Sequence, residues 1–308
     1  MHDSIGIPAC FTGERHGTDP VIPATSISSS VFRTEITGRH HLVTVTWCKD
    51  LLVHRLSIAF EGPGNSDEGS ACKLELKPWQ FWKRQGSKNL TVEGSDVTIV
   101  WDLRMAIFDG ETAPITDYYV AVVCKGEVVL LMGDMKKEAY RRTGCRPALT
   151  DPVFISRTEH LFGKSKFFAR IKFHEKGKLH HVSVVERKSA SSLGNERPAD
   201  PEMEIAIDGE KVSHVKRLQW KFRGNEEITV GGRKLELYWD VHDWLFETGP
   251  RHGLFIFRPI MTVEELPDPT LVLPALSKEE KTSMAHDEMA SGHTLQGFSF
   301  FMYAWKTQ

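Results

Sequence analysis

Apolar and polar residues alternate in short runs along most of this chain, and turn-forming residues separate the runs. Because side chains on a β-strand point alternately to its two faces, this period of two residues predicts strands with one buried face. We expect strands at 42–47, 55–60, 73–76, 90–92, 97–101, 118–123, 127–131, 168–173, 181–185, 203–207, 228–230, 235–239 and 254–257. Helical patterns occur only at 134–143 and in a charged stretch at 277–290, and the aromatic run at 297–305 predicts a last strand.

One stretch of the chain occurs twice, at 82–108 and again 138 positions later at 220–246. Without a gap the two stretches agree at nine of 27 positions, including both Trp-Asp pairs, Trp101-Asp102 and Trp239-Asp240. Each contains two apolar runs around a glycine turn, which is typical of a β-hairpin. The alternation predicts two core-facing sets, which are Val97, Ile99, Trp101 and Leu103 in the first copy and Leu235, Leu237, Trp239 and Val241 in the second.

The likeness between the two parts of the chain extends beyond this hairpin. The strand pair 42–47 and 55–60 has its counterpart 126 positions on, at 168–173 and 181–185. We therefore predict an all-β protein of two internally duplicated, antiparallel halves, each like a β-sandwich or barrel, with a few short helices. The expected boundaries are a flexible leader at 1–30, the first half at 31–134, a connector at 135–165, the second half at 166–259, and a linker with a C-terminal docking segment at 260–308.

Comparison of Asp102 with Asp240 indicates whether the repeated Trp-Asp pair is structural or catalytic. A carboxylate that closes a strand end is expected in both copies, whereas a catalytic one need not recur, so a structural role is favoured. The second copy adds His242 and Asp243, which the first copy lacks. An enzyme that uses Asp240 and His242 is therefore kept as the third hypothesis, although the sequence supplies no nucleophile or third ligand for it.

Composition narrows the class of protein. Of 308 residues, 40% are hydrophobic and 26% charged, which is ordinary for a globular chain. No window approaches the roughly 18 consecutive apolar residues of a membrane-spanning helix. Five widely spaced cysteines without a CxxC pair favour reduced thiols in an intracellular compartment. We expect no cofactor and no metal, since no histidine joins these cysteines at ligand spacing.

Positive charge is concentrated in the middle of the chain. Residues 136–188 hold 14 Lys/Arg and five Asp/Glu, whereas the formal net charge of the whole chain is −2. The candidate residues for binding an anionic surface are Lys164, Lys166, Arg170, Lys172, His174, Lys176 and Lys178. Alternation places Arg170, Lys172 and His174 opposite the inward-facing Ala169, Ile171 and Phe173. Two interpretations stay open, a patch for anionic lipid or an acidic partner and a solvated sheet face. Nucleic acid is not expected at a pI near 6.7.

Two further groups of residues are candidates for function. Trp79, Phe81 and Trp82 lie close together beside lysines and would suit a groove for a sugar or a lipid tail, although packing in a core is the favoured explanation. Ser189, Ser191 and Ser192 follow Arg187 and Lys188 in an expected loop. Phosphorylation there would add about −1.5 to −2 charges per site and weaken an anion-binding patch, while the alternative is a plain linker.

Several runs carry a resemblance to a known family. They are Leu42–Trp47, Leu76–Trp79 with Phe81-Trp82, Asp117–Val122, Lys172–His174 with Gly177-Lys178, Gln219–Asn225, Tyr238–Trp244, Ile7–Phe11 and Tyr303–Lys306. In these runs the chain resembles the plant family known as domain of unknown function 868, over nearly its whole length. The resemblance implies an intracellular plant protein with no family catalytic residues to carry over. It also implies, as a hypothesis about class, an adaptor in Rho-type GTPase and actin signalling at the plasma membrane.

The first functional hypothesis is therefore a non-enzymatic interaction or adaptor protein of the plant cytoplasm, peripheral at the plasma membrane, whose protein partners the sequence does not identify. Its basic middle segment would engage an anionic membrane or an acidic signalling partner. The alternative is a β-protein that binds a small ligand such as a sugar or a lipid.

Overall fold

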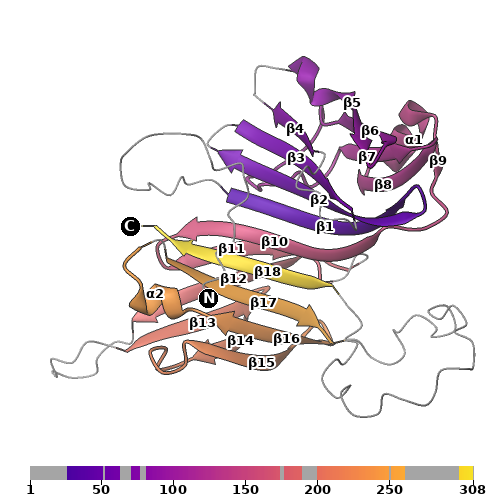
Figure 1. Ribbon diagram of the computed structural model, residues 1–308. Coiled ribbons are helices and arrows are strands. Elements are labelled where there is room, and N and C mark those ends of the chain that lie inside the picture. Colours follow the sequence, from indigo (N-terminus) through magenta and orange to yellow (C-terminus); the bar gives the residue numbers. More distant parts are fainter. Residues whose placement is uncertain are drawn as a thin grey trace, which may run out of the picture.

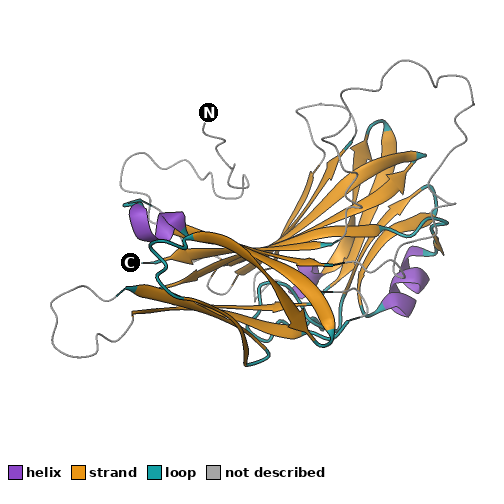
Figure 2. Cartoon of the chain, turned by 90° about the horizontal axis from the view of Figure 1, so that it is seen from below, coloured by secondary structure: helices purple, strands orange, loops and turns teal. Residues whose placement is uncertain are grey.

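The computed structural model describes residues 26–50, 53–62, 71–76, 81–173, 177–188, 200–249, 251–260 and 298–307. Strands make up most of this part of the chain, and its helices are short (Figure 2). The strands form three sheets, with nine, four and five strands. The largely β fold that the alternating pattern predicts is confirmed.

The nine-stranded sheet contains strands from both ends of the described chain (Figure 1). Its order is β15 (Arg223–Val230), β16 (Arg233–Asp240), β17 (Arg251–Pro259), β18 (Ser299–Lys306), β10 (Val153–Gly163), β1 (Ser26–Ile36), β2 (Arg39–Asp50), β3 (Val53–Glu61) and β4 (Ala71–Leu76). Neighbours pair antiparallel except β10 and β18, which are parallel. The predicted pair 42–47 and 55–60 is the antiparallel pair β2 and β3.

The two smaller sheets lie against this large one. One consists of β11 (Lys166–Ile171), β12 (His180–Lys188), β13 (Pro201–Ile207) and β14 (Glu210–Val215). The other consists of β5 (Gln85–Val92), β6 (Ser95–Asp102), β7 (Tyr119–Cys124), β8 (Glu127–Gly133) and the short β9 (Arg146–Pro147). The strand predicted at the C-terminal end of the chain is β18, and it lies inside the large sheet.

The helices in the described ranges are α1 (Lys136–Thr143), α2 (His242–Phe246) and the short 3₁₀ helix η2 (Phe81–Arg84). Helix α1 confirms the helix predicted at 134–143, and Gly144 ends it in a left-handed conformation with φ of 64°. The charged stretch at 277–290 lies outside the described residues. Residues 26–30, which the sequence suggested as the end of a leader, form the start of strand β1.

Strand β10 joins the two halves of the large sheet, although its residues fall in the segment expected only to connect them. It pairs with β1 on one side and with β18 on the other. In Figure 1 it runs between the upper strands β1–β4 and the lower strands β15–β18. The two halves therefore share one continuous sheet.

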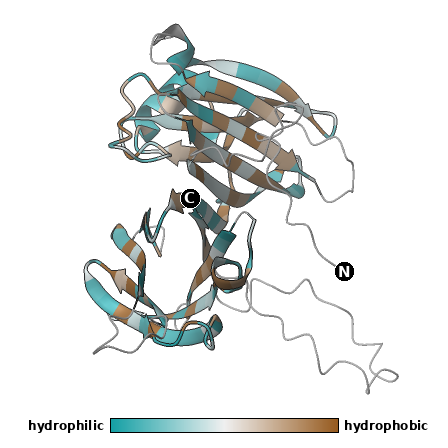
Figure 3. Ribbon diagram, turned by 90° about the vertical axis from the view of Figure 1, so that its left-hand side faces the viewer, coloured by the Kyte–Doolittle hydropathy of each residue, from teal (hydrophilic) through white to brown (hydrophobic). Residues whose placement is uncertain are grey.

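Two main hydrophobic cores lie between sheets, one in each half (Figure 3). The first core is built from β1–β4 and β5–β8, and the second from β11–β14 and β15–β18. Both core-facing sets predicted from the repeat lie in these cores: Val97, Ile99, Trp101, Leu103, Leu235, Leu237 and Val241 are at most 8% exposed. Trp239 packs against the second core and is partly buried.

The two repeated hairpins make matching contacts. In each, a glycine pairs with the tryptophan of the neighbouring strand, Gly86 with Trp101 and Gly224 with Trp239. The indole Nε1 of Trp101 donates to the carbonyl of Lys83 at 3.1 Å, and that of Trp239 to Lys221 at 3.0 Å. The glycines repeat because each indole lies flat over the place where a side chain would begin.

Alanine at Gly86 or Gly224 is expected to destabilise the fold by about 1–3 kcal/mol, the usual cost of forcing extra volume into a packed site. A Cβ at Gly86 would lie 2.9 Å from Cζ2 of Trp101, and one at Gly224 would press still closer on Trp239. Urea unfolding of each variant measures the loss. The matched control is Gly249→Ala, where nothing lies within 4 Å, and an equal loss in the control would contradict the explanation.

Candidate functional site

The predicted basic residues lie along strand β11 and its two ends. The expected alternation is present, because Phe167, Ala169 and Ile171 are buried while Lys166 and Phe168 face outward. Lys164 and Lys166 precede or begin the strand, and Lys172 and Lys178 follow it. Six residues of strand separate Lys166 from Lys172, a distance of about 20 Å. His174 and Lys176 lie outside the described residues.

Acidic side chains pair with two of these cations. Arg170 Nη1 lies 3.3 Å from Asp109 Oδ2, and Arg170 Nε lies 3.0 Å from Glu111 Oε1. Lys178 Nζ lies 3.6 Å from Asp208 Oδ2. The two carboxylates on Arg170 come from a loop of the first half, so this arginine links the halves and its charge is compensated. Among the described members of the predicted set, the charges of Arg170 and Lys178 are therefore compensated.

One end of the second half gathers cations that come from distant parts of the chain. Strand register places the start of β11 beside the end of β12 (Lys166 opposite Val185), and the start of β13 beside the end of β14 (Met203 opposite Val215). We call this the basic end and define it by Lys164, Lys166, Lys216, Arg217, Trp220 and Lys221. Helix α2 and the end of β18 lie at the same end, on the left in Figure 1. None of its five cations forms an ion pair with another described residue.

Trp220 projects from a turn at this end. The side chain is 82% exposed, whereas Leu218, two residues earlier, is fully buried. The carbonyl of Arg217 accepts hydrogen bonds from the amides of Trp220 at 2.9 Å and Lys221 at 3.1 Å, and Leu218 N donates to the Pro201 carbonyl at 3.0 Å. Arg217 adopts the left-handed conformation with φ of 54°, which costs free energy for a residue other than glycine. An anchored, strained turn thus holds an exposed tryptophan among cations.

Other aromatic rings lie next to this turn. Phe222 contacts Phe246 edge-on at 5.6 Å between ring centres, and the His242 ring lies 5.0 Å from Phe246. Phe246 is 51% exposed. Its counterpart in the first copy, Phe108, packs edge-on against Trp47 and is partly buried. The second copy therefore exposes aromatic surface that the first copy covers, and such exposed apolar surface marks interaction sites.

The repeated aspartates hold the backbone after their strands. Asp102 Oδ1 accepts the amide of Arg104, and Asp240 Oδ1 accepts the amide of His242, both at 3.1 Å. Burial of Asp102 would raise its pKa, but hydrogen bonds from Arg104 outweigh burial and the pKa of Asp102 is lowered. Asp240 pairs instead with Arg223 at 2.8 Å. Both aspartates have the same structural contact, which is the role that the repeat favoured.

Residues of the second half form a histidine and aromatic cluster on the outward face of β10, β17 and β18. The His160 ring stacks on Tyr303 at 4.8 Å, and His252 lies 4.8 Å from Trp305. Trp305 Nε1 donates to His160 Nδ1 at 3.1 Å. Burial, with a smaller effect from His252, lowers the pKa of His160 to about 4. His160 is therefore neutral at physiological pH and acts as a hydrogen-bond acceptor.

The groove expected at Trp79, Phe81 and Trp82 lies largely outside the described part of the chain. Trp79 is not described, and Phe81 and Trp82 begin η2 without described side chains.

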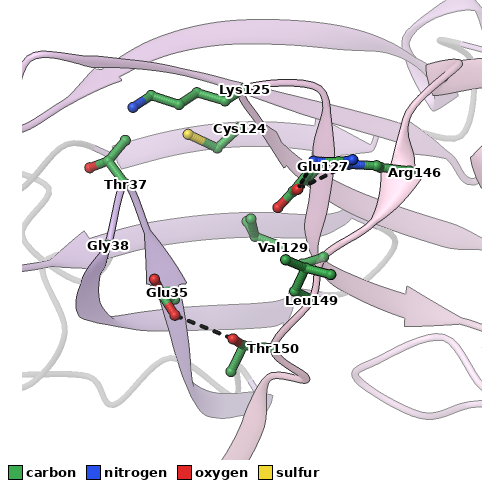
Figure 4. Close-up of a pocket in the computed structure, with 11 residues that line it drawn as sticks. Glu35, Thr37, Gly38, Cys124, Lys125, Glu127, Val129, Arg146, Leu149 and Thr150 are labelled. Carbon is green, nitrogen blue, oxygen red and sulfur yellow. Dashed lines mark hydrogen bonds and ion pairs between the residues drawn. The ribbon is translucent and has the colours of Figure 1, made fainter.

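A cavity of about 440 Å³ lies elsewhere in the first half, between the turns β1–β2 and β7–β8 (Figure 4). In it Thr150 Oγ1 donates to Glu35 at 3.3 Å, and Arg146 pairs with Glu127 at 2.7 Å. These polar groups satisfy one another. A second cavity of about 420 Å³ lies beside Phe168 and Arg170.

The proposed phosphorylation sites Ser189, Ser191 and Ser192 also lie outside the described residues. They follow the end of β12, so that the chain leaves the second half at the basic end. Neither α1 nor α2, nor any other helix in the described ranges, is long and apolar enough to cross a membrane.

Comparison with known protein families matches residues 23–306 to the family described as plant protein of unknown function (DUF868). The chain belongs to this family. The resemblance seen in its sequence is thereby confirmed. No curated protein and no solved structure matches the chain. The description of the DUF868 family assigns no activity. The candidate site of this DUF868 protein is therefore identified from the geometry of its own residues.

The turn at 216–222 of this DUF868 protein was not among the sites predicted from the sequence. The signal was present, because residues 216–223 alternate cations with aromatic and apolar residues in the run Lys-Arg-Leu-Gln-Trp-Lys-Phe-Arg. Trp220 was counted only as part of the repeated hairpin. Whether a tryptophan such as Trp220 is exposed depends on what packs beside it, and the sequence pattern does not reveal that.

Proposed function

We propose that this chain is a non-enzymatic interaction protein of plant cells that docks peripherally on an anionic membrane surface through its basic end. The observation that supports the proposal is the 82% exposed Trp220, which stands among Lys216, Arg217 and Lys221. Tryptophan favours the membrane–water interface, where its ring is apolar and its indole N–H keeps a polar partner. In this proposal the protein docks on the cytoplasmic face of the plasma membrane, where anionic lipids attract basic segments.

Electrostatics favours the basic end over the middle of β11. Each lysine or arginine near an anionic bilayer contributes about 1 kcal/mol of binding free energy. The cations of the basic end have no described acidic partner to give up, whereas Arg170 would first have to leave Asp109 and Glu111. The turn is already held by hydrogen bonds to Arg217 and Pro201, so little conformational entropy is lost on docking.

Vesicle sedimentation tests the proposal. We expect the chain to bind vesicles containing phosphatidylserine, to bind neutral phosphatidylcholine vesicles weakly, and to lose binding as salt rises. The variant Lys216→Ala/Arg217→Gly/Lys221→Ala should bind about 100-fold more weakly, since about 1 kcal/mol is lost at each position. Glycine at 217 keeps the left-handed backbone of the turn. Trp220→Ala should also weaken binding, without removing its salt dependence.

The matched control is Lys172→Ala, which removes an exposed lysine from the far end of β11. It should bind as the unchanged chain does. Equal losses for Lys172→Ala and the triple variant would reduce the effect to net charge and overturn the docking site. Absence of binding to anionic vesicles would overturn the membrane proposal, and salt-sensitive binding to acidic proteins alone would replace it by the acidic-partner hypothesis.

We also propose that the chain arose by duplication of one β-unit, so that each half is a sandwich-like pair of sheets. The matching Gly–Trp contacts and aspartate turns of the two hairpins support this. In this proposal the first copy kept Phe108 packed against a core, and the second copy exposes Phe246 and Trp220 for docking.

A further inference from the structure

Helix α2 carries a group of potential metal ligands that the docking proposal does not use. His242, Asp243 and Glu247 each offer one ligand atom, and the three atoms lie within 4.8 Å of one another. His242 Nδ1 lies 3.3 Å from Asp243 Oδ1. A second imidazole approaches from strand β17, with His252 Nδ1 3.2 Å from Asp243 Oδ2. One carboxylate is thus bracketed by two histidines.

These separations match the edges of a metal coordination sphere. Zinc binds imidazole nitrogen and carboxylate oxygen at about 2.0–2.2 Å in a tetrahedral arrangement, so two adjacent ligand atoms lie about 3.3 Å apart. His242 and Asp243 already have this spacing. All three ligand atoms lie within 4.8 Å of one another, and Glu247, which is exposed, can move its carboxylate inward.

The backbone that carries the ligands is firmly held. Between Asp243 and Glu247, Trp244 is 3% exposed and its Nε1 donates to the Ala304 carbonyl at 2.8 Å. Its ring stacks on Phe167 at 5.3 Å. His252 is held between Tyr303 and Trp305. A ligand set on a rigid support keeps its geometry without a metal, which lowers the cost of binding one.

The group is specific to the second half. The positions that correspond to His242, Asp243 and Glu247 in the first copy are Arg104, Met105 and Asp109. Arg104 bonds to Asp102, and Asp109 pairs with Arg170. The fold that the two copies share therefore does not require His242, Asp243 and Glu247. Their presence in the second copy alone indicates a role other than folding.

We propose that His242, Asp243 and Glu247 bind a divalent transition-metal ion, with water completing its coordination. In this site His252 is a positioning residue that orients the Asp243 carboxylate through its second oxygen. An imidazole with carboxylates favours Zn²⁺ or a neighbouring ion over Ca²⁺ and Mg²⁺, which prefer all-oxygen sites. The proposal is independent of membrane docking, since none of these side chains belongs to the basic end.

Titration calorimetry of the full chain, without an affinity tag and after removal of metals, tests the site with Zn²⁺. We expect one saturable site, absent with Ca²⁺ or Mg²⁺, and a visible absorption spectrum when Co²⁺ is added. His242→Ala and the isosteric Asp243→Asn should each weaken Zn²⁺ binding at least 100-fold. His252→Ala should weaken it about 10- to 100-fold, as loss of an orienting partner does. Circular dichroism of each variant confirms that it is folded.

The matched control is His214→Ala, because His214 also bonds a carboxylate, Glu202, at 2.9 Å on the surface. This variant should bind Zn²⁺ as the unchanged chain does. The proposal is overturned if the unchanged chain shows no saturable Zn²⁺ binding, or if folded Asp243→Asn binds Zn²⁺ equally well. Vesicle binding measured without Zn²⁺ is expected to persist, so that failure of the metal proposal can be distinguished from failure of the docking proposal.

Discussion

Replacing Arg157 by alanine is expected to destabilise the folded chain by about 3–5 kcal/mol at neutral pH, the usual cost of leaving a buried charge without its partner. Glu159 is 5% exposed and lies on β10, where the two halves of the large sheet meet. Arg157 Nε donates to its Oε1 at 2.7 Å, and Ser28 Oγ of the neighbouring strand donates to the same oxygen at 2.8 Å. Without Arg157, the carboxylate keeps one neutral donor.

The loss should depend on pH in a defined direction. Burial raises the pKa of Glu159 above its ordinary value of 4.5, and Arg157 opposes that rise. The folded state therefore holds this proton more firmly than the unfolded state. The stabilisation is present below the ordinary pKa and is lost as pH rises through the raised value. Removal of Arg157 raises the pKa of Glu159 further, so the destabilisation should be larger at pH 8 than at pH 5.

Urea unfolding of Arg157→Ala at pH 5 and pH 8 measures both effects. The double variant Arg157→Ala/Glu159→Gln is the control, because a neutral amide replaces the carboxylate and the difference between the two pH values should disappear. A loss of the same size at both pH values in the single variant would show that Arg157 acts by packing its aliphatic part and not by compensating charge.

Local pattern predicted the hairpins of this fold well, because each is decided by neighbouring residues. Alternation placed Val97, Ile99 and Leu103 in the core, and the glycine turns set which strands pair. Strand β10 could not be found in this way. Its partners Ser28 and Met302 lie more than 100 residues away in opposite directions. Pairing at such separations depends on how the halves pack, and a local period carries no information about that.

The candidate site could also be predicted only as far as it depends on neighbouring residues. The face that Arg170 and Lys172 share follows from strand geometry alone, and the burial of Ile171 between them agrees with it. The carboxylates of Asp109 and Glu111 that compensate Arg170 come from a loop of the other half, so the sequence could not reveal them. The basic end likewise combines residues near 165 with residues near 217, which come to the same end of one sheet only through the register of β11–β14.

Replacing Trp244 by alanine is the second change with a large expected effect, about 3–5 kcal/mol of destabilisation, as is usual when a buried aromatic side chain is removed. The indole fills the space over Gly253, where a Cβ would lie 2.8 Å from its ring. It also lies beneath the Lys306 ammonium, 4.9 Å from the ring centre. Alanine leaves a cavity, and the carbonyl of Ala304 loses its indole donor.

Thermal unfolding of Trp244→Ala, followed by circular dichroism, measures the loss. Phe246→Ala is the matched control on the same helix, because Phe246 is 51% exposed and its removal should cost well under half as much. If α2 is held mainly by Trp244, the variant should also lose Zn²⁺ affinity although every proposed ligand is present. A stable Trp244→Ala variant with unchanged Zn²⁺ binding would mean that α2 is positioned by the chain on either side of it. Trp244 would then not be the rigid support of His242 and Asp243.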